Sequence, residues 1–133
     1  RDVVYVDPVR LVRINRLLGT ILPTIKSTDI INTAKENGRR ICSIGTTAMR
    51  AMESSVTAQR LLKPAEGWTN HFIHPPYNFN VADSLVTNFH LPKTSLLIMT
   101  CAFAGYDLAM EAYKKAIKDK YRFFSYGDAL LFI

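Results

Sequence analysis

The segment Thr87–Ser95 (TNFHLPKTS) and the apolar run at 96–103 (LLIMTCAF) decide how this sequence is interpreted. The segment brings an amide, an imidazole, an ammonium and two hydroxyls next to what reads as a buried element. Pro92 has a fixed φ and no N–H, so it suits the first turn of a helix, and Gly105 suits the end of one. We therefore expect a helix over residues 93–104 with Asn88 to His90 at its mouth.

The composition indicates one folded domain with an anionic partner. The chain has 133 residues, of which 48% are hydrophobic, and this is enough to build a core. Its net charge of +6 favours nucleic acid over a membrane surface, because no basic amphipathic face stands out. Cys42 and Cys101 lie outside any CxxC pattern, and no signal peptide or apolar run of spanning length is seen, which predicts a reduced, cytoplasmic chain. The first residue, Arg1, is not Met, so we expect a part of a longer protein.

The order of elements predicts an α/β fold, a layered sheet with flanking helices. Helix, strand, tight turn and helix follow one another around the short β-type run at 41–44. The other expected elements are a strand at 3–6, a helix over 11–18 ending at Gly19, a helix starting near Asp29 behind a Ser27 or Thr28 cap and ending at Asn37 and Gly38, a helix over 48–57, β-type runs at 72–73 and 77–81, a helix capped by Asp107, and a strand at 129–133.

The turn Gly45–Thr46–Thr47 is a candidate anion site. A strand that ends in Gly before a helix points backbone N–H groups outward, where they can hold a phosphate or a carboxylate. Arg50 and Glu53 are three residues apart and share one face of the following helix. The alternative is a good helix cap beside a surface ion pair. Neither GxGxxG nor a GKS or GKT motif is present, so neither nucleotide fingerprint applies.

Three further patterns have a functional and a structural interpretation. His71, His74 and His90 invite a metal hypothesis, but His-x-x-His in an extended segment without a Cys or Glu partner is weak, and we predict no metal. Lysines at 114, 115, 118 and 120 could face phosphate or could simply complement a helix C-terminus. The aromatic residues interleaved with arginine at 121–126 could stack on bases or pack in the core.

Four blocks in this order resemble the C-terminal part of the S-adenosylmethionine:tRNA ribosyltransferase-isomerases of queuosine biosynthesis. They are IGTTAMRAME at 44–53, TNFHLPKTSL at 87–96, AFAG at 102–105 and RFFSYGD at 122–128. The resemblance is good from about Asp29 onward, so 29–133 is the motif-bearing region and 1–28 a poorly matched lead-in. Where the family has Pro-Gly-Tyr, this chain has Pro75-Pro76-Tyr77.

The resemblance implies a reaction. The ribosyl part of S-adenosylmethionine is transferred to the aminomethyl group of a 7-deazaguanine base in tRNA to give epoxyqueuosine, and adenine and methionine leave. S-adenosylmethionine is then a co-substrate, and no permanently bound cofactor is expected. It also implies a larger enzyme with a β-barrel-like domain, to which residues 1–133 contribute the C-terminal α/β portion. The chain alone is therefore expected to be an inactive monomer that contacts tRNA and no membrane.

The implied chemistry suggests roles for the residues. The sulfonium acidifies the adjacent ribose carbon, so a base is required, and an acid should protonate the departing adenine. His90 and Asp128 are the candidates, in that order. The residues assigned to substrate binding are Gly45, Thr46, Thr47, Arg50, Glu53, Asn88, Phe89, Lys93, Ser95, Arg122 and Tyr126.

Structural roles remain open for several of these residues. Asn88 could cap the turn before Pro92, Asp128 could pair with Arg122, and His90 could be a local hydrogen-bond anchor. Two rival classes also remain, a tRNA-binding module without turnover and a structural or assembly fragment that packs through its aromatic C-terminus.

Overall fold

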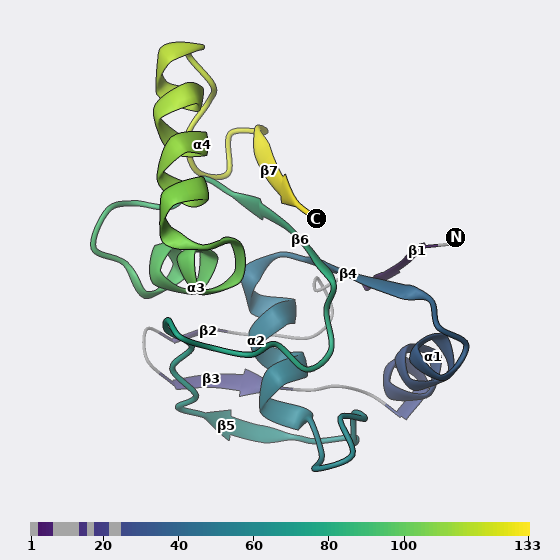
Figure 1. Cartoon of the computed structure of the whole chain (residues 1–133). Coiled ribbons are helices and arrows are strands. Elements are labelled where there is room, and N and C mark those ends of the chain that lie inside the picture. The colour runs from purple at the N-terminus through teal and green to yellow at the C-terminus, as the bar shows by residue number, and fades with distance from the viewer. Residues whose placement is uncertain (1–2, 7–13, 16–17, 22–24) are drawn as a thin grey trace.

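The computed structural model describes residues 3–6, 14–15, 18–21 and 25–133, and these residues adopt an α/β fold (Figure 1). One sheet has four strands in the order β1 (Val3–Val6), β4 (Arg40–Ile44), β6 (Ser84–Asn88) and β7 (Ala129–Phe132). The first three strands run parallel, and β7 pairs antiparallel with β6. The predicted fold class is confirmed as a small mixed sheet with flanking helices.

A second, antiparallel sheet is built from β2 (Ile14–Asn15), β3 (Leu18–Ile21) and β5 (Gly67–Thr69). In Figure 1, α2 (Thr46–Ser55) lies between the two sheets. The helix α1 (Ile25–Glu36) lies near β1 and β4, whereas α3 (Ser95–Ala104) and α4 (Tyr106–Lys118) lie on the opposite side.

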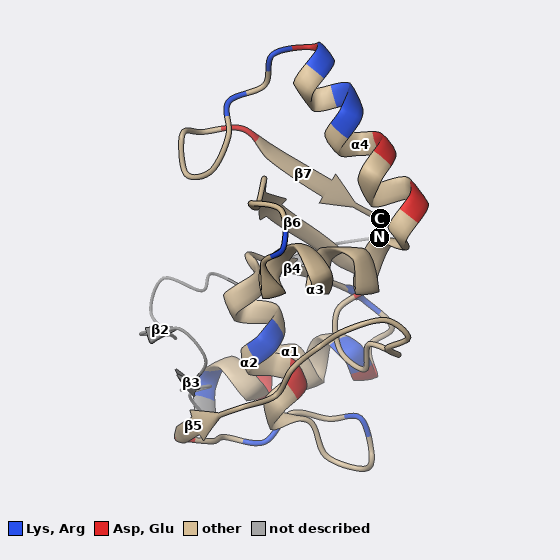
Figure 2. Ribbon diagram, turned by 90° about the vertical axis from the view of Figure 1, so that its left-hand side faces the viewer, with Lys and Arg blue, Asp and Glu red and all other residues tan. Residues whose placement is uncertain are grey.

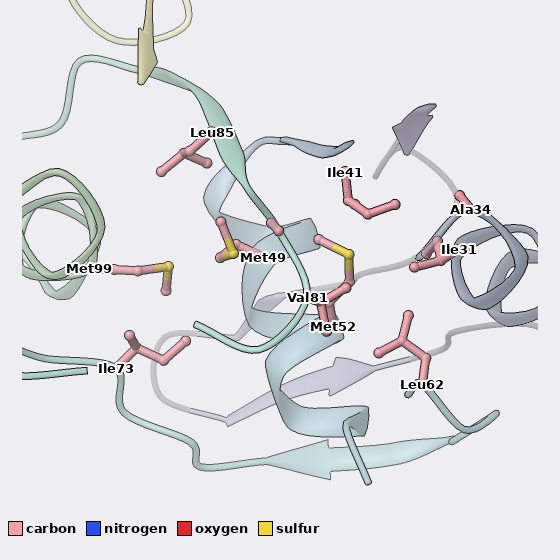
Figure 3. Close-up of a cluster of buried hydrophobic side chains, with 11 residues drawn as sticks. Ile31, Ala34, Ile41, Met49, Met52, Leu62, Ile73, Val81, Leu85 and Met99 are labelled. Atoms are coloured by element: carbon pink, nitrogen blue, oxygen red, sulfur yellow. The ribbon is translucent and has the colours of Figure 1, made fainter. Parts of the chain in front are cut away.

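The helix α2 forms because its apolar residues recur at helical spacing. Ala48, Met49, Ala51 and Met52 are all buried, so the helix presents one apolar side to the core. This side packs into a core cluster (Figure 3) that combines residues of β4, β6, α1, α2, α3 and the segments between them. The cluster consists of Ile31, Ala34, Ile41, Met49, Met52, Leu62, Ile73, Val81, Ala82, Leu85 and Met99.

The helices α3 and α4 meet at Gly105, whose φ of 87° lies in the left-handed region that favours glycine. Gly105 ends α3 and is also the N-cap of α4, so the predicted Asp107 cap is wrong and Asp107 lies in the first turn. Among the described residues, no single helix is long and apolar enough to cross a membrane. The helices α3 and α4 reach that length and composition only as a pair, bent by 114°.

A buried carboxylate connects α2 to the chain that leads into β6. Glu53 is 3% exposed, and its Oε1 accepts hydrogen bonds from the backbone N–H groups of Asn80 (2.9 Å) and Val81 (3.2 Å). Its Oε2 accepts from the Tyr77 hydroxyl (3.0 Å) and the Asn80 amide (2.9 Å). Burying a carboxylate is costly unless its oxygens are hydrogen-bonded, and here four donors do this. The pKa of the Tyr77 hydroxyl is raised, mainly because the group is partly buried and also because the negative charge of Glu53 lies beside it.

The starts of three further helices differ from the prediction. The helix predicted over 48–57 spans Thr46–Ser55. The helix predicted over 93–104 begins at Ser95, because the Thr94 hydroxyl caps it by accepting from the Leu97 N–H at 3.3 Å. Lys93 lies before the cap with a φ of 61°. The helix predicted from Asp29 begins at Ile25, so Ser27 and Thr28 lie inside it and are not caps.

One predicted helix and two predicted strands were wrong. The apolar spacing at 11–18 predicted a helix, but Ile14–Asn15 and Leu18–Ile21 are strands, and the rest of that interval lies outside the described residues. Short apolar runs are ambiguous, and here the pairing of β3 with β5 prevails over helical spacing. The runs at 72–73 and 77–81 form no strand. In the second run, the backbone N–H groups of Asn80 and Val81 donate to Glu53.

We expect Glu53→Ala to destabilise the intact protein by roughly 2–4 kcal/mol, because removing the carboxylate leaves four donors without their acceptor. Urea unfolding followed by circular dichroism measures the change. The matched control is Glu66→Ala, since Glu66 is exposed and its replacement should stay within about 0.5 kcal/mol. Equal effects of the two substitutions would contradict the anchoring role.

Candidate functional site

The carboxyl ends of the parallel strands β4 and β6 meet at one edge of the sheet. Their register places Ile44 opposite Val86, and the Gly45 N–H donates to the Val86 carbonyl at 2.7 Å. The turn that starts α2 therefore lies directly beside the last residues of β6. In open α/β sheets, ligands bind outside the carboxyl ends of parallel strands, so this edge is the candidate site.

The Gly45–Thr46–Thr47 turn keeps the geometry expected of an anion site. Gly45 has a φ of 93°, which a residue with a Cβ rarely adopts, and it is the N-cap of α2. Because Gly45 has no side chain, the N-cap residue makes no side-chain hydrogen bond to the start of α2. Thr46 is buried and Thr47 is half-buried, so the turn is packed on one side and accessible on the other. The backbone N–H groups of the first turn of α2 lie at the positive end of the helix dipole.

His90 is held by two hydrogen bonds just beyond β6. The residue is 9% exposed, its Nε2 lies 2.8 Å from the Thr87 hydroxyl, and its backbone N–H donates to the Tyr113 hydroxyl at 2.7 Å. Phe89 packs beside it in a second core with Tyr113 and Ala116. Burial lowers the pKa of His90 below its ordinary value of 6.5, so the ring is neutral near pH 7.

The contacts of Thr87 indicate which nitrogen of His90 is basic. The Thr87 hydroxyl also lies 3.3 Å from the Asn88 carbonyl, to which it can only donate. In the tautomer that satisfies both contacts, Nε2 of His90 carries the proton and donates it to Thr87. The Nδ1 atom is then the unprotonated nitrogen and the one able to accept a proton.

Asp128 pairs with Arg122, which is the structural alternative considered for both residues. The guanidinium Nη2 of Arg122 lies 3.1 Å from Oδ1 of Asp128, and the side-chain and backbone hydrogen bonds of Arg122 lower the pKa of that carboxyl. Asp128 is therefore ionised near neutral pH and has no proton to donate. The Asn88 amide donates to the Asp128 carbonyl at 3.3 Å, which brings this loop next to the end of β6.

Arg50 and Ser95 line a hollow of about 80 Å³ between α2, α3 and the segment after β5. The remaining lining includes Asn70 and His71. Arg50 is half-buried, and its Nη2 donates to the Thr69 carbonyl at 2.8 Å. The alternative of a surface ion pair between Arg50 and Glu53 is not what the structure shows, because Glu53 is buried and, in the described part of the chain, its hydrogen bonds come from residues 77–81.

The other predicted site residues separate into buried and exposed groups. Glu53 and Phe89 are buried and serve the fold, so neither presents its side chain to a substrate in the described part of the chain. Lys93 and Tyr126 are exposed, and they lie on different loops at 93 and 126. The structure thus places the turn at 45–47 beside Val86 of β6 and Asn88 beside Asp128, with His90 two residues beyond the end of that strand. It places Arg50 and Ser95 around the hollow.

The three histidines do not assemble into a metal site. Within the described residues, no group of three or more His, Cys, Asp or Glu side chains could hold an ion. His71 instead lies 5.6 Å from the ring of Tyr77, and His74 lies 5.3 Å from the ring of Phe72. Cys42 and Cys101 are both buried and free.

Sequence reasoning did not identify the residues that position His90. Thr87 lies three residues before His90 in the same block, so its hydroxyl could have been proposed as a partner. Tyr113 lies 23 residues away on α4, and no local pattern indicates that its hydroxyl accepts from the His90 backbone. Asn70 likewise reaches the hollow through tertiary folding alone.

Comparisons with known proteins identify the family and the fold to which this chain is similar. A family model described as "Queuosine biosynthesis protein" matches residues 23–132. A protein of Flavobacterium psychrophilum named S-adenosylmethionine:tRNA ribosyltransferase-isomerase is 56% identical over 110 residues, and the match covers 83% of this chain and 32% of that protein. A protein of the same name from Halothermothrix orenii is 54% identical, and the match covers 80% of this chain and 32% of that protein. The crystal structure of the S-adenosylmethionine tRNA ribosyltransferase from Thermotoga maritima matches with a TM-score of 0.74 and 42% identity, covering 87% of this chain and 40% of that one. The chain thus spans about a third of the length of these curated relatives.

The lowered pKa of His90 predicts a pH dependence of stability. Between the folded-state pKa and 6.5 the unfolded chain binds more protons than the folded chain. Stability should therefore be complete above about pH 6.5 and decline as the pH falls through that window. His90→Asn should reduce this decline in urea unfolding at pH 7.5 and pH 5, whereas His74→Asn, at an exposed position, should retain it. An unchanged decline in His90→Asn would show that another group is responsible.

Proposed function

The chain belongs to the queuosine biosynthesis protein family, and from this premise we propose that the intact protein is an S-adenosylmethionine:tRNA ribosyltransferase-isomerase. It would transfer the ribosyl part of S-adenosylmethionine to 7-aminomethyl-7-deazaguanine in tRNA, form epoxyqueuosine, and release adenine and methionine. Because the curated relatives are about three times as long as the matched region, we expect the intact protein to carry a further, β-barrel-like domain.

The observation that supports this proposal most directly is the meeting of two motif blocks at one edge of the sheet. The turn at 45–47 and the segment at 87–90 lie far apart in sequence, and the hydrogen bond between Gly45 and Val86 brings them together. One block supplies a helix N-terminus for an anion, and the other supplies a neutral imidazole. A cationic sulfonium substrate with a carboxylate needs both kinds of group.

His90 would act as the base. Its Nδ1 would take a proton from the ribose carbon bonded to the sulfonium, and the electron pair left on that carbon is stabilised by the adjacent positive sulfur. The imidazolium formed in this way is an acid and can return its proton to the departing adenine. Asp128, which is ionised beside Arg122, could then accept a proton or fix the loop, but it could not be the first acid.

The groups around the turn would bind the anionic parts of the substrates. The N–H groups at Thr46 and Thr47 suit a carboxylate or a phosphate. Arg50 and Ser95 line the nearby hollow and could contact the methionine carboxylate or a tRNA phosphate. Asn88 is exposed at the end of β6, where its amide could orient ribose hydroxyls, and Lys93 could add a charge at the rim.

The size of the hollow supports the expectation that this chain alone is inactive. A volume of about 80 Å³ accommodates a carboxylate-sized group, whereas pockets for whole ligands are typically about 300–1,000 Å³. The remaining walls of an S-adenosylmethionine site would come from the rest of the intact protein.

The decisive experiment incubates the intact protein with S-adenosylmethionine and tRNA that carries the aminomethyl-deazaguanine, and measures adenine release. Adenine should appear only when both substrates are present, and the same tRNA with guanine at that position is the control. Binding of tRNA without adenine release would favour a non-catalytic binding module.

We expect His90→Asn to reduce the rate of adenine release by on the order of a hundredfold or more, because general acid–base groups contribute at least that much. Asparagine keeps a hydrogen bond to Thr87 but cannot accept the proton. tRNA affinity, measured by filter binding, should be unchanged. A variant that retains nearly normal turnover would remove His90 from the mechanism.

Arg50→Ala should raise the apparent KM for S-adenosylmethionine or tRNA on the order of tenfold and change kcat much less, since it removes a binding contact. Loss of the hydrogen bond to Thr69 should also cost about 1 kcal/mol of stability, so melting is measured in parallel. Lys63→Ala, at an exposed position, is the control. Unchanged kinetics with a large drop in Tm would assign Arg50 to the fold alone.

A further inference from the structure

The charges of α4 are separated along its length (Figure 2). The acidic residues Asp107 and Glu111 lie in its first half, whereas its second half and the following loop carry lysines 114, 115, 118 and 120 and Arg122. Two of these cations are neutralised, Lys115 by Asp119 at 2.7 Å and Arg122 by Asp128. The surface that remains is a basic end of the molecule formed by the exposed residues Lys114, Lys118 and Lys120.

Exposed aromatic rings lie on the loop that follows this basic end. Tyr126 is 75% exposed, Phe124 is 42% exposed, and Tyr121 is exposed as well. Phe124 has a φ of 58°, a conformation that a bulky side chain rarely adopts. Tyr121 and Phe124 make edge contacts with Phe89 and Phe123, with ring centroids 6.1 Å and 6.2 Å apart, and Tyr126 is the most exposed of the three rings. Exposed large rings and strained backbone both concentrate at functional sites.

The loop is anchored beside the candidate site. Phe123 stacks on Phe89 with ring centroids 5.8 Å apart, and Phe89 is the neighbour of His90. The pair of Arg122 and Asp128 closes the loop, and the Asn88 amide donates to the Asp128 carbonyl. The exposed rings are therefore presented from a fixed base at the same edge of the sheet as His90.

We propose that the loop at 121–128 and the basic end of α4 bind the unpaired loop of an RNA, with Tyr126 and Phe124 stacking on bases and the lysines contacting phosphates. Aromatic side chains recognise single-stranded bases by stacking, whereas the bases of a duplex are not accessible to them. The combination of cations and exposed rings matches this ligand better than duplex RNA, which would need the cations alone. The proposal rests on the proposed function only for the identity of the RNA, a tRNA anticodon loop.

The test compares two RNAs on the intact protein, the hairpin of the substrate anticodon arm and a blunt RNA duplex with the same number of phosphates. Tyr126→Ala should weaken hairpin binding roughly five- to a hundredfold and leave duplex binding unchanged. Tyr126→Trp should restore hairpin binding, because tryptophan also stacks. Tyr106→Ala is the matched control, since Tyr106 is 67% exposed at the acidic end of the same helix and should have no effect.

The phosphate contacts have their own signature. The double substitution Lys114→Gln and Lys118→Gln should weaken both RNAs equally and lower the slope of log affinity against log salt by about one for each phosphate that is no longer neutralised. The pair Lys26→Gln and Lys63→Gln, exposed elsewhere on the chain, should not change the slope.

Three outcomes would overturn the proposal. Tyr126→Ala could weaken the binding of both RNAs equally, or it could leave the binding of both unchanged, as Tyr106→Ala should. It could also lower the Tm of the intact protein without changing RNA binding, which would mean that another part of that protein covers the loop. Adenine release is measured separately on the same preparations. An intact protein that turns over but binds hairpin equally well in all variants would refute this surface and leave the proposed activity in place.

Discussion

The four hydrogen bonds to the buried carboxylate of Glu53 are the contact on which the rest of the structure depends. They attach residues 77–81, which pair with no strand among the described residues, to the side of α2. Two residues later, Asp83 bonds to Ile41 in both directions, through its side chain at 2.7 Å and its backbone N–H at 2.8 Å. These contacts position the start of β6 next to β4, so their parallel register follows, and with it the position of the β6 carboxyl end beside the turn at Gly45.

Two titratable groups near the carboxyl end of β6 lie in different electrostatic environments. His90 is buried between Thr87 and the aromatic core, where desolvation disfavours its charged form and leaves it neutral. Asp128 is kept ionised by Arg122 on the adjacent loop. Burial thus keeps His90 neutral, whereas a cation keeps Asp128 unprotonated and negative. Both groups can therefore accept a proton, and neither carries an acidic proton to donate.

Some of the aromatic residues near the C-terminus pack in the core, whereas others are exposed on the surface. Phe123 packs against Phe89 and Tyr113, and it holds the loop to the core. The next residue, Phe124, points into a more exposed position with a left-handed backbone. A run of aromatic residues therefore serves two purposes, since one ring anchors the loop and its neighbours remain accessible.

The sequence by itself was sufficient for the α/β class, the strand before Gly45, the helix after it, the apolar helix that ends at Gly105 and the family resemblance, because each depends on residues that are close in the chain. It also placed His90, Asn88 and the turn at 45–47 among the site residues, although it could not show that they lie at one edge of the sheet. Only the tertiary structure decided that Glu53 is a buried anchor, that 77–81 is not a strand, and that 14–15 and 18–21 pair as strands. The physical reason is that these outcomes depend on partners distant in sequence, such as the Tyr113 hydroxyl for His90 and β5 for β3, and local propensity is too weak to determine them.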